Sequence, residues 1–430
     1  MHPFVRIAGI ICVFMLAAIG WLILGTVTSS RTTDQRGALD GRVADLWGSP
    51  QTQSAPSFDL RWTEQETKTE QITDAVGHTS TKKTVETVTR VQPMDPAQSR
   101  IVVDLHLDQR RKGLLWFPLY DVGFRGAWTY QHAEPESRDL VLTFTLPDKS
   151  GVYDDFRFIV DGVDLAPRLR PKDGVIATTV PVKSGQTVRL EVGYRSRGMD
   201  EWIYRPTQQV GQLEDFQLRM TTDFANIDFP KLTMSPSHKE AKGKGYELEW
   251  KFARLVAGYG IGMVMPSHVQ PGELAAKMSF SAPISLALFL VFIYVVTLLR
   301  RIEVHPINFL LVAAAFFSFN LLFGYTADRL PVEIAFALSS AVSVGLVASY
   351  LRLVVGPRFA LVEAGLAQLT YQVGFSIAHF YDGYTGLSIT VLVILTLFLL
   401  MQLTGRLSWS SVFAGGAVAG GAEGPRRVTQ

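Results

Sequence analysis

The stretch IAGIICVFMLAAIGWLILGTV, from Ile7 to Val27, holds no charged residue in 21 positions. An α-helix rises about 1.5 Å per residue, so roughly 20 apolar residues cross the ~30 Å hydrocarbon layer of a bilayer. We therefore predict a transmembrane helix here. The stretch exceeds the apolar core of a signal peptide, and no small-residue cleavage site follows it, so a retained anchor is favoured over a removed leader.

Five further apolar runs of 18 to 21 residues occupy the last third of the chain. They are Ala282–Leu299, Pro306–Tyr325, Pro331–Leu351, Phe359–Ala378 and Tyr384–Thr404. Their only carboxylates, Glu333 and Glu363, lie near predicted helix ends. One such run is compatible with a buried helix of a soluble protein, whereas six predict an integral membrane protein.

Basic residues near the helix ends predict the orientation. With the N-terminus in the cytoplasm, eight arginines flank the spans on that side and only Arg329 lies in a short outer loop. The eight are Arg6, Arg300, Arg301, Arg352, Arg358, Arg406, Arg426 and Arg427. This positive-inside bias predicts that both termini lie in the cytoplasm and that residues 29–280 lie outside, which is the periplasm if the organism is Gram-negative.

The segment after the anchor changes character. Leu39, Val43, Leu46 and Trp47 share one face of a predicted amphipathic helix, which packs on the outer domain or lies on the membrane surface. Strand signals follow. They cover 61–73, 81–92, 101–107, 140–146, 155–160, 187–193, 214–221 and 246–252, and the first two form a long polar ribbon. Gly258–Gly262 reads as a flexible approach to the membrane.

These patterns predict an α+β membrane protein with an antiparallel, sandwich-like β-rich domain. The expected parts are an anchor (1–28), a periplasmic β domain (29–280), a five-helix transmembrane bundle (281–405) and a flexible cytoplasmic tail (406–430). The periplasmic segment holds 32 basic and 33 acidic residues, which gives nucleic-acid binding little electrostatic support. Cys12 is the sole cysteine, so no intrachain disulfide forms.

Four stretches resemble the bacterial inner-membrane CreD family. They are Arg42–Gly48 followed by Gln51, Leu119–Tyr120 with Phe124–Trp128, His305–Val312, and Leu403–Trp409. The motif His305, Pro306 and Asn308 is the strongest of these matches. The loop Tyr325–Arg329 departs from the family pattern, so the chain resembles a divergent member.

The resemblance implies a role in cell-envelope homeostasis and in the stress response to cell-wall damage. It implies an anchor, a large outer domain and a terminal helix bundle, in the order that the hydropathy also predicts. It brings no catalytic residues with it. We therefore expect a compartment and a process from the family, and no reaction.

Two rows of residues in the predicted bundle are candidates for function or packing. Gln368, Gln372, Ser376 and His379 share a polar face of the fifth run, which favours interhelical hydrogen bonds or, alternatively, a polar path for a substrate or proton. Small residues at spacing four in the preceding helix predict close packing within the bundle or in a homo-oligomer. These are Ala337, Ala341, Gly345 and Ser349.

Enzymatic motifs are weak. Ser80–Lys83 fits the S-x-x-K pattern of penicillin-interacting enzymes, but S-D-N-like and K-T-G partner motifs do not occur. The histidines show no H-E-x-x-H or paired spacing. We therefore expect no catalytic residues, no metal and no cofactor.

The sequence thus predicts a non-enzymatic membrane protein whose periplasmic domain binds an envelope protein, a glycan or a lipid. A transporter or lipid flippase that uses the polar path in the bundle is the second hypothesis. A membrane-bound wall hydrolase is the third.

Overall fold

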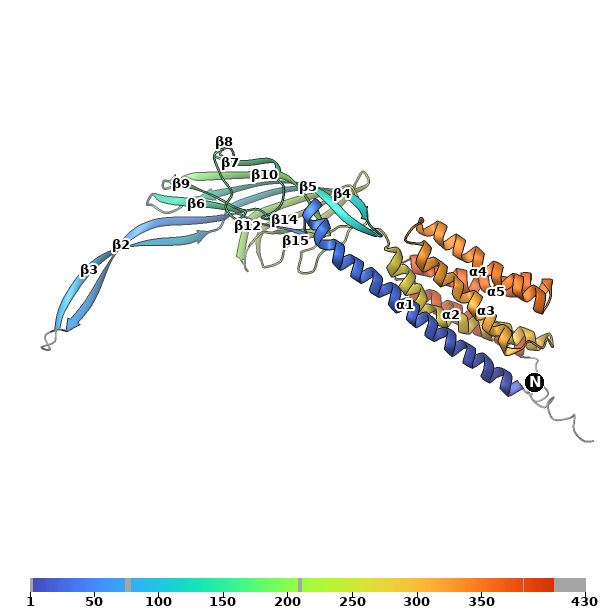
Figure 1. The fold of residues 1–430 in the computed structure, drawn as a ribbon. Coiled ribbons are helices and arrows are strands. Elements are labelled where there is room, and N and C mark those ends of the chain that lie inside the picture. Colours follow the sequence, from blue (N-terminus) through green and yellow to red (C-terminus); the bar gives the residue numbers. More distant parts are fainter. Residues whose placement is uncertain (1–2, 74–78, 208–210, 382, 406–430) are drawn as a thin grey trace, which may run out of the picture. The chain divides into compact units, whose positions relative to one another are not determined.

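The computed structural model describes residues 3–73, 79–207, 211–381 and 383–405 (Figure 1). The chain divides into two compact units. The helical unit comprises residues 1–37 and 269–430, and the β unit comprises residues 38–268. The predicted tail, 406–430, lies outside the described residues.

Helix α1 (Pro3–Trp47) is one continuous helix of 45 residues. It runs through both the predicted anchor and the predicted amphipathic segment, because no proline separates them and the helix continues through Gly37 and Gly41. Gly48 follows it at φ +106°, where a Cβ would lie 2.2 Å from the Arg197 carbonyl oxygen. Only glycine adopts that conformation without steric strain, so α1 ends here.

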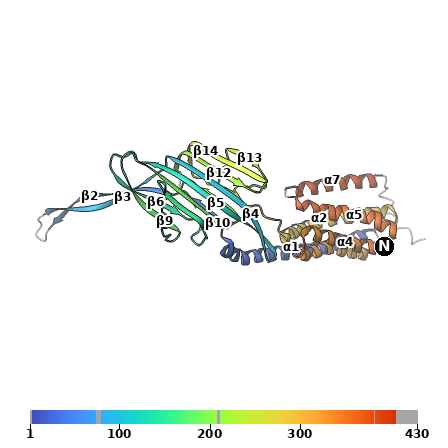
Figure 2. The ribbon, with the colours of Figure 1, turned by 90° about the horizontal axis from the view of Figure 1, so that it is seen from above.

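Fifteen strands form three sheets in the described part of the β unit (Figures 1 and 2). The three-stranded sheet has the order β1 (Gln51–Ser54), β11 (Glu201–Arg205), β15 (Ile261–Val264). The four-stranded sheet has the order β3 (Thr79–Met94), β2 (Ser57–Thr73), β6 (Arg138–Thr145), β9 (Val175–Val182). The eight-stranded sheet has the order β13 (His238–Lys242), β14 (Gly245–Ala257), β12 (Gly211–Thr222), β4 (Gln98–Lys112), β5 (Leu115–Gln131), β10 (Thr187–Met199), β7 (Asp154–Val160), β8 (Val163–Asp164).

The predicted β-rich class is confirmed, and all eight predicted strands overlap strands of the structure. Two details differ. The pairs β1–β11 and β4–β12 are parallel, whereas the other pairs of neighbouring strands are antiparallel. The glycine-rich segment 258–262, expected to be flexible, enters strand β15, where a Cβ on Gly262 would lie 2.7 Å from the Trp202 carbonyl oxygen. Glycine there permits close backbone approach.

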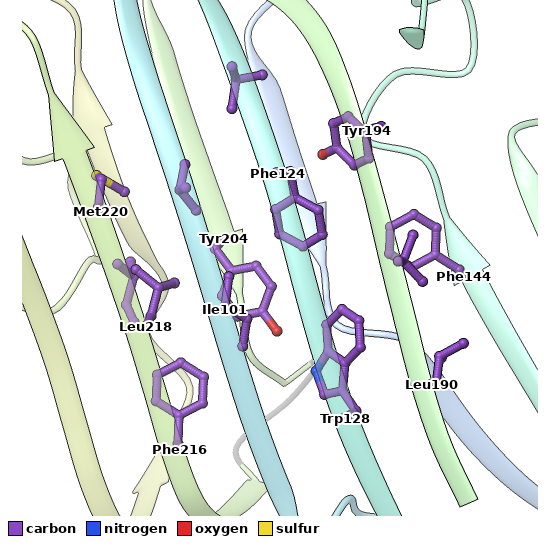
Figure 3. Close-up of a cluster of buried hydrophobic side chains, with 14 of the residues drawn as sticks. Ile101, Phe124, Trp128, Phe144, Leu190, Tyr194, Tyr204, Phe216, Leu218 and Met220 are labelled. Atoms are coloured by element: carbon purple, nitrogen blue, oxygen red, sulfur yellow. The ribbon is translucent and has the colours of Figure 1, made fainter. Parts of the chain in front are cut away.

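One aromatic core joins the three sheets (Figure 3). Phe124 of β5 is fully buried and its ring lies 5.1 Å from that of Tyr194 and 6.3 Å from that of Trp202. Successive side chains of a strand point to opposite faces of the sheet. Because Phe124 and Tyr194 point into the core, the residues next to them in each strand point outward. The outer face of the eight-stranded sheet is thereby left for polar residues.

The β2–β3 ribbon extends beyond its sheet (Figure 1). Only residues 57–61 of β2 pair with β6, while the remainder of the strand pairs with β3 alone. Thr63, Gln65 and Thr67 alternate with charged side chains along it. A two-stranded ribbon of this composition buries little apolar surface.

The end of α1 packs on the β unit, as the structural alternative for this amphipathic segment predicts. Val43 is fully buried in a cluster with Leu115, Phe117 and Met199. Leu46, predicted on the same apolar face, is exposed instead.

The helical unit contains α2 (Pro271–Leu299), α3 (Pro306–Thr326), α4 (Val332–Val354) and α7 (Thr385–Thr404) besides α1. Between α4 and α7 lie the π-helical turns η1 (Phe359–Ala364) and η2 (Leu369–Gly374), the α-helical turns α5 (Gly365–Gln368) and α6 (Phe375–Ile377), and the 3₁₀ turn η3 (Ala378–Phe380). In the described part of the chain, five helices are long and apolar enough to cross a membrane. The predicted span Phe359–Ala378 is helical, but alternates π and α turns.

Interhelical contacts define two ends of the helical unit. At one end, Arg6 Nη2 donates to the Ile302 carbonyl at 3.3 Å, and Arg300 pairs with Glu363. At the other end, Arg31 pairs with Asp328 and donates to the Gly324 carbonyl at 3.2 Å. Helix α1 is therefore antiparallel to α2 and parallel to α3. Most apolar side chains of α7 are exposed, which a hydrocarbon solvent tolerates and water does not.

Phe124→Ala should destabilise the protein by about 3–5 kcal/mol, because it removes a fully buried ring and leaves a cavity between three sheets. The measurement is urea unfolding of the detergent-solubilised full chain, followed by tryptophan fluorescence. Val152→Ala, at a position that is 74% exposed, is the control and should change stability little. Equal effects of the two substitutions would contradict the assignment of Phe124 to the core.

Candidate functional sites

A charged groove lies on the outer face of the eight-stranded sheet. Its volume is about 630 Å³, and strands β4, β5, β10 and β7 form it. The charged lining residues are Asp104, His106, Asp121, Arg125, Asp154, Asp155, Arg157, Arg195 and Arg197. Four arginines and four aspartates therefore share one cavity. No local sequence pattern marks this site, since its residues come from four separate strands.

Two glycines open the floor of the groove. Gly123 of β5 is paired across the sheet with Asp104 and with Arg195. Gly193 of β10 is paired with Arg125 on one side and Arg157 on the other. Paired residues of antiparallel strands have Cα atoms about 4.5–5.5 Å apart, so charged side chains flank each glycine closely. The glycines leave space where a side chain would otherwise fill the groove.

Three ion pairs cross the groove. Arg125 Nη2 lies 3.0 Å from Asp104 Oδ2, Arg197 Nε lies 3.0 Å from Asp121 Oδ1, and Arg195 Nη1 lies 3.3 Å from Asp155 Oδ2. These side chains are largely exposed, so each pair stabilises the fold by only about 0–1 kcal/mol. The arginines can therefore exchange their partners for those of a ligand at small energetic cost.

A β-bulge in strand β7 turns two of its charged side chains into the groove. Its register against β10 shifts between Gly193 and Arg195, so that Arg157 faces Gly193 while Asp154 faces Arg195. Asp155, at the bulge, has a φ of 53°. Residues 154 and 157 would face opposite sides of a regular strand, but the extra residue turns both into the cavity.

Buried tyrosines support the floor from the core side. Tyr194 donates to Gln53 Oε1 at 2.8 Å, and burial raises its pKa well above the usual value. Tyr153 packs edge-on against Tyr194 and donates to the Asp148 carbonyl at 2.6 Å, while burial raises its pKa to about 12. Both phenols stay neutral at physiological pH, so they position the floor and the start of β7 without adding charge.

A polar cluster lies in the interior of the helical unit. Gln368 Nε2 donates to Ser343 Oγ at 2.9 Å and to Gln372 Oε1 at 2.8 Å. Gln372 Nε2 donates to the Phe316 carbonyl at 2.6 Å, and both glutamines are almost fully buried. The structure thus places this part of the predicted polar face inside the bundle. Ser343 is a cluster member that the sequence analysis missed.

The other two residues of that face lie further along the same helical segment. His379 Nε2 lies 2.8 Å from Ser281 Oγ of α2, and Ser376 is buried. Gln368 Oε1 is buried without a partner in the described structure. The segment that holds the four residues contains two π-helical turns, which occur frequently at functional sites.

The small-residue row of α4 does not pack within the chain. Ala337, Ala341, Gly345 and Ser349 are all exposed, and a Cβ on Gly345 would meet nothing within 4 Å. The row on the nearly opposite face of α4 is buried instead, and consists of Ala335, Ser339, Ser343 and Val347. Of the two packing alternatives for the predicted row, packing inside this chain's bundle is therefore wrong. The homo-oligomer alternative stays a prediction.

The motif at the start of α3 has a structural role. His305 is the N-cap, and its Nδ1 accepts from the Ile307 backbone at 3.3 Å. Pro306 occupies the first helical turn, where its missing N–H has no cost. Asn308 Oδ1 accepts from the Tyr350 hydroxyl at 2.8 Å, which links α3 to α4.

The structure places Ser80 of the S-x-x-K pattern in strand β3, where it pairs with Ile72. Penicillin-interacting chemistry needs that serine at a helix N-terminus, so the pattern has no such role here. Among the described residues, no group of three or more His, Cys, Asp or Glu side chains is arranged to hold a metal ion.

Gln372→Leu and Gln368→Leu should each destabilise the helical unit by about 1–2 kcal/mol, because each leaves buried polar partners unsatisfied. The double substitution should cost less than the sum, since the two amides share a hydrogen bond. Unfolding in mixed detergent micelles, followed by fluorescence, gives the three values. Gln402→Leu, on the exposed face of α7, is the control. Strict additivity would contradict the cluster.

Comparison with known proteins places the chain in a family. The model of the family described as inner membrane protein CreD matches residues 2–282 and 275–410. No curated protein matches the chain. Among solved structures, a Legionella pneumophila protein of proposed nutrient-binding function is 8% identical, with 52% of this chain and 82% of that chain covered and a TM-score of 0.30. A likeness that low carries no argument about fold or function. Since the family model matches nearly the whole chain, this protein belongs to the CreD family of inner membrane proteins.

Proposed function

We propose that this protein is a non-enzymatic binding protein of the cell envelope. In this proposal the β unit lies in the periplasm and takes an envelope protein, a glycan or a lipid into the charged groove. The helix bundle anchors it in the inner membrane. The process is the one that the CreD family implies, which is envelope integrity and the response to cell-wall damage.

The groove is the observation that carries this proposal. Its 630 Å³ volume lies within the range of about 300–1,000 Å³ that is typical of small-ligand sites. Its charged side chains are exposed and weakly paired, so they are available to a ligand. The bulge and the two glycines are local irregularities that create the cavity in an otherwise regular sheet. Irregularities of this kind are common beside binding sites.

The charge distribution supports the periplasmic orientation of the β unit. In the helical unit, the start of α1, the end of α2 and the start of α3 share one end, because Arg6 contacts Ile302 and Gly9 approaches Pro306. Arg300 and Arg301 lie at that end of α2. The positive-inside rule favours the cytoplasm for it.

A second function, transport through the bundle, is favoured by one observation. Gln368 Oε1 is a buried polar atom without a partner in the described structure, in a segment with two π turns. Intramembrane polar groups of this kind often lie on substrate or proton paths. The amide nitrogens of both glutamines, however, donate to groups inside the bundle, Ser343 Oγ and the Phe316 carbonyl. These bonds support the alternative in which the bundle serves only as a membrane anchor.

The proposed orientation predicts the labelling of two engineered cysteines. In a Cys12→Ser background, Val152→Cys should react with a membrane-impermeant maleimide when only the outer membrane is permeabilised. Arg358→Cys should react only after the inner membrane is disrupted. Both positions are exposed, so access to the reagent alone decides the result. The reverse pattern would contradict the orientation.

Rescue of a deletion strain separates binding from transport. The leucine side chain of Gly193→Leu should fill the groove. A deletion strain that carries this variant should therefore fail to grow in the presence of detergent and a cell-wall antibiotic, although the variant is present in the membrane at normal abundance. Ala127→Leu, also outward-facing on β5 but outside the groove, should rescue. The triple variant Gln368→Leu, Gln372→Leu, His379→Leu should rescue if the bundle is an anchor. Rescue by Gly193→Leu together with loss in the triple variant would favour transport over binding.

A further inference from the structure

We propose that the groove binds a zwitterionic ligand of short-peptide size. Its carboxylate lies over Gly193 between Arg125 and Arg157, and its ammonium group lies against Asp154. This inference rests on the proposed binding function and adds the chemical class of the ligand to it.

The carboxylate position follows from the register of three strands. Gly193 has an arginine directly opposite on each neighbouring strand, Arg125 on β5 and Arg157 on β7. With about 5 Å between paired strands, the two arginine Cα atoms are about 10 Å apart across the glycine. Two guanidinium groups at that separation can converge on one carboxylate, and their planar forks match its two oxygens. The absent side chain at Gly193 leaves space for it.

Arg157 is the freest cation of this pair. It is exposed, and no described residue lies within ion-pair or hydrogen-bond distance of its guanidinium. Arg125 has one partner, Asp104, in an exposed pair. A ligand carboxylate therefore gains two charge-assisted contacts while displacing at most one weak ion pair.

Asp154 supplies the complementary position for a cation. It lies opposite Arg195, but Arg195 pairs with Asp155 instead, so Asp154 keeps no ion pair with a described residue. The bulge is the reason that Asp154 and Arg157 line the same cavity. One strand thus presents a free carboxylate and a free guanidinium to the groove, a few residues apart.

The overall charge of the groove favours a zwitterion over a simple anion or cation. Four arginines and four aspartates balance one another. A phosphate or a polyamine would bring one of the two free groups next to a like charge, which is unfavourable. A ligand with one carboxylate and one ammonium satisfies both. The groove volume admits a ligand of two or three amino-acid residues.

Binding of matched peptide mixtures to the full-length protein in detergent tests this inference. The first probe is a mixture of tripeptides with varied side chains and free termini. The second is the same mixture with C-terminal amides, and the third carries N-terminal acetyl groups. Inorganic phosphate is the fourth. The free tripeptides should raise the unfolding temperature and give heat in calorimetry. Amides, acetylated peptides and phosphate should bind about tenfold more weakly or not at all.

Variants then assign the two ends of the ligand. Arg157→Gln should weaken the free tripeptides about tenfold or more and abolish discrimination against the amides. Asp154→Asn should do the same for discrimination against the acetylated peptides. Arg189→Gln, outward-facing on β10 and paired with Glu191 at 2.9 Å, is the matched control and should change nothing.

Each negative outcome has one meaning. Absence of binding by the free tripeptides, or equal binding of all four probes, would overturn the zwitterion inference. If Gly193→Leu nevertheless abolishes rescue, the groove is functional and only the ligand class is wrong. If Gly193→Leu rescues fully, the proposed function itself fails, whatever the peptides do.

Discussion

Hydrocarbon offers a peptide backbone no hydrogen-bond partner, and the organisation of this chain depends on that constraint. Segments in the bilayer must satisfy their N–H and C=O groups internally, so they form helices. The β unit is strand-rich because its segments alternate polar and apolar residues, which a water-facing sheet requires. Helix α1 has one half for each environment. Its first half is apolar, as a membrane span must be, and its second half buries Val43 in the β unit.

The same constraint explains the interior of the helical unit. Gln368 and Gln372 are buried in the bundle, where amide groups need partners, and Gln368 Nε2 donates to Ser343 while Gln372 Nε2 donates to the Phe316 carbonyl. The His305 cap, Pro306 and the bond from Tyr350 to Asn308 satisfy the start of α3 in a similar way. The family motif thus consists of a helix cap, a proline in the first turn and a hydrogen bond to a second helix. Such a set stabilises the bundle and does not by itself imply chemistry.

In the β unit, the groove is a consequence of how its core is built. Phe124, Trp128 and Tyr194 point into the core from β5 and β10 (Figure 3). The alternate positions Gly123, Arg125, Gly193 and Arg195 therefore point outward. The pairing of strands far apart in sequence then brings glycine next to arginine. Rigid strands hold these charges at set spacings, which a loop would not do.

The sequence by itself determined the class of this protein. Long uncharged runs, period-two alternation and the His305–Asn308 motif are local signals, and local signals were enough to predict the α+β membrane architecture and the CreD resemblance. The buried polar face at Gln368 and Gln372 was also predictable, because helical spacing places those residues together. Only the tertiary structure decided which face of α4 packs inside, since the Ala337 row and the Ala335 row lie about 160° apart around the helix, and the packing of the neighbouring helices selects the face that is buried. It alone decided the groove, because strand register and the bulge at Asp155 bring four distant segments together, and register depends on the whole packed sheet.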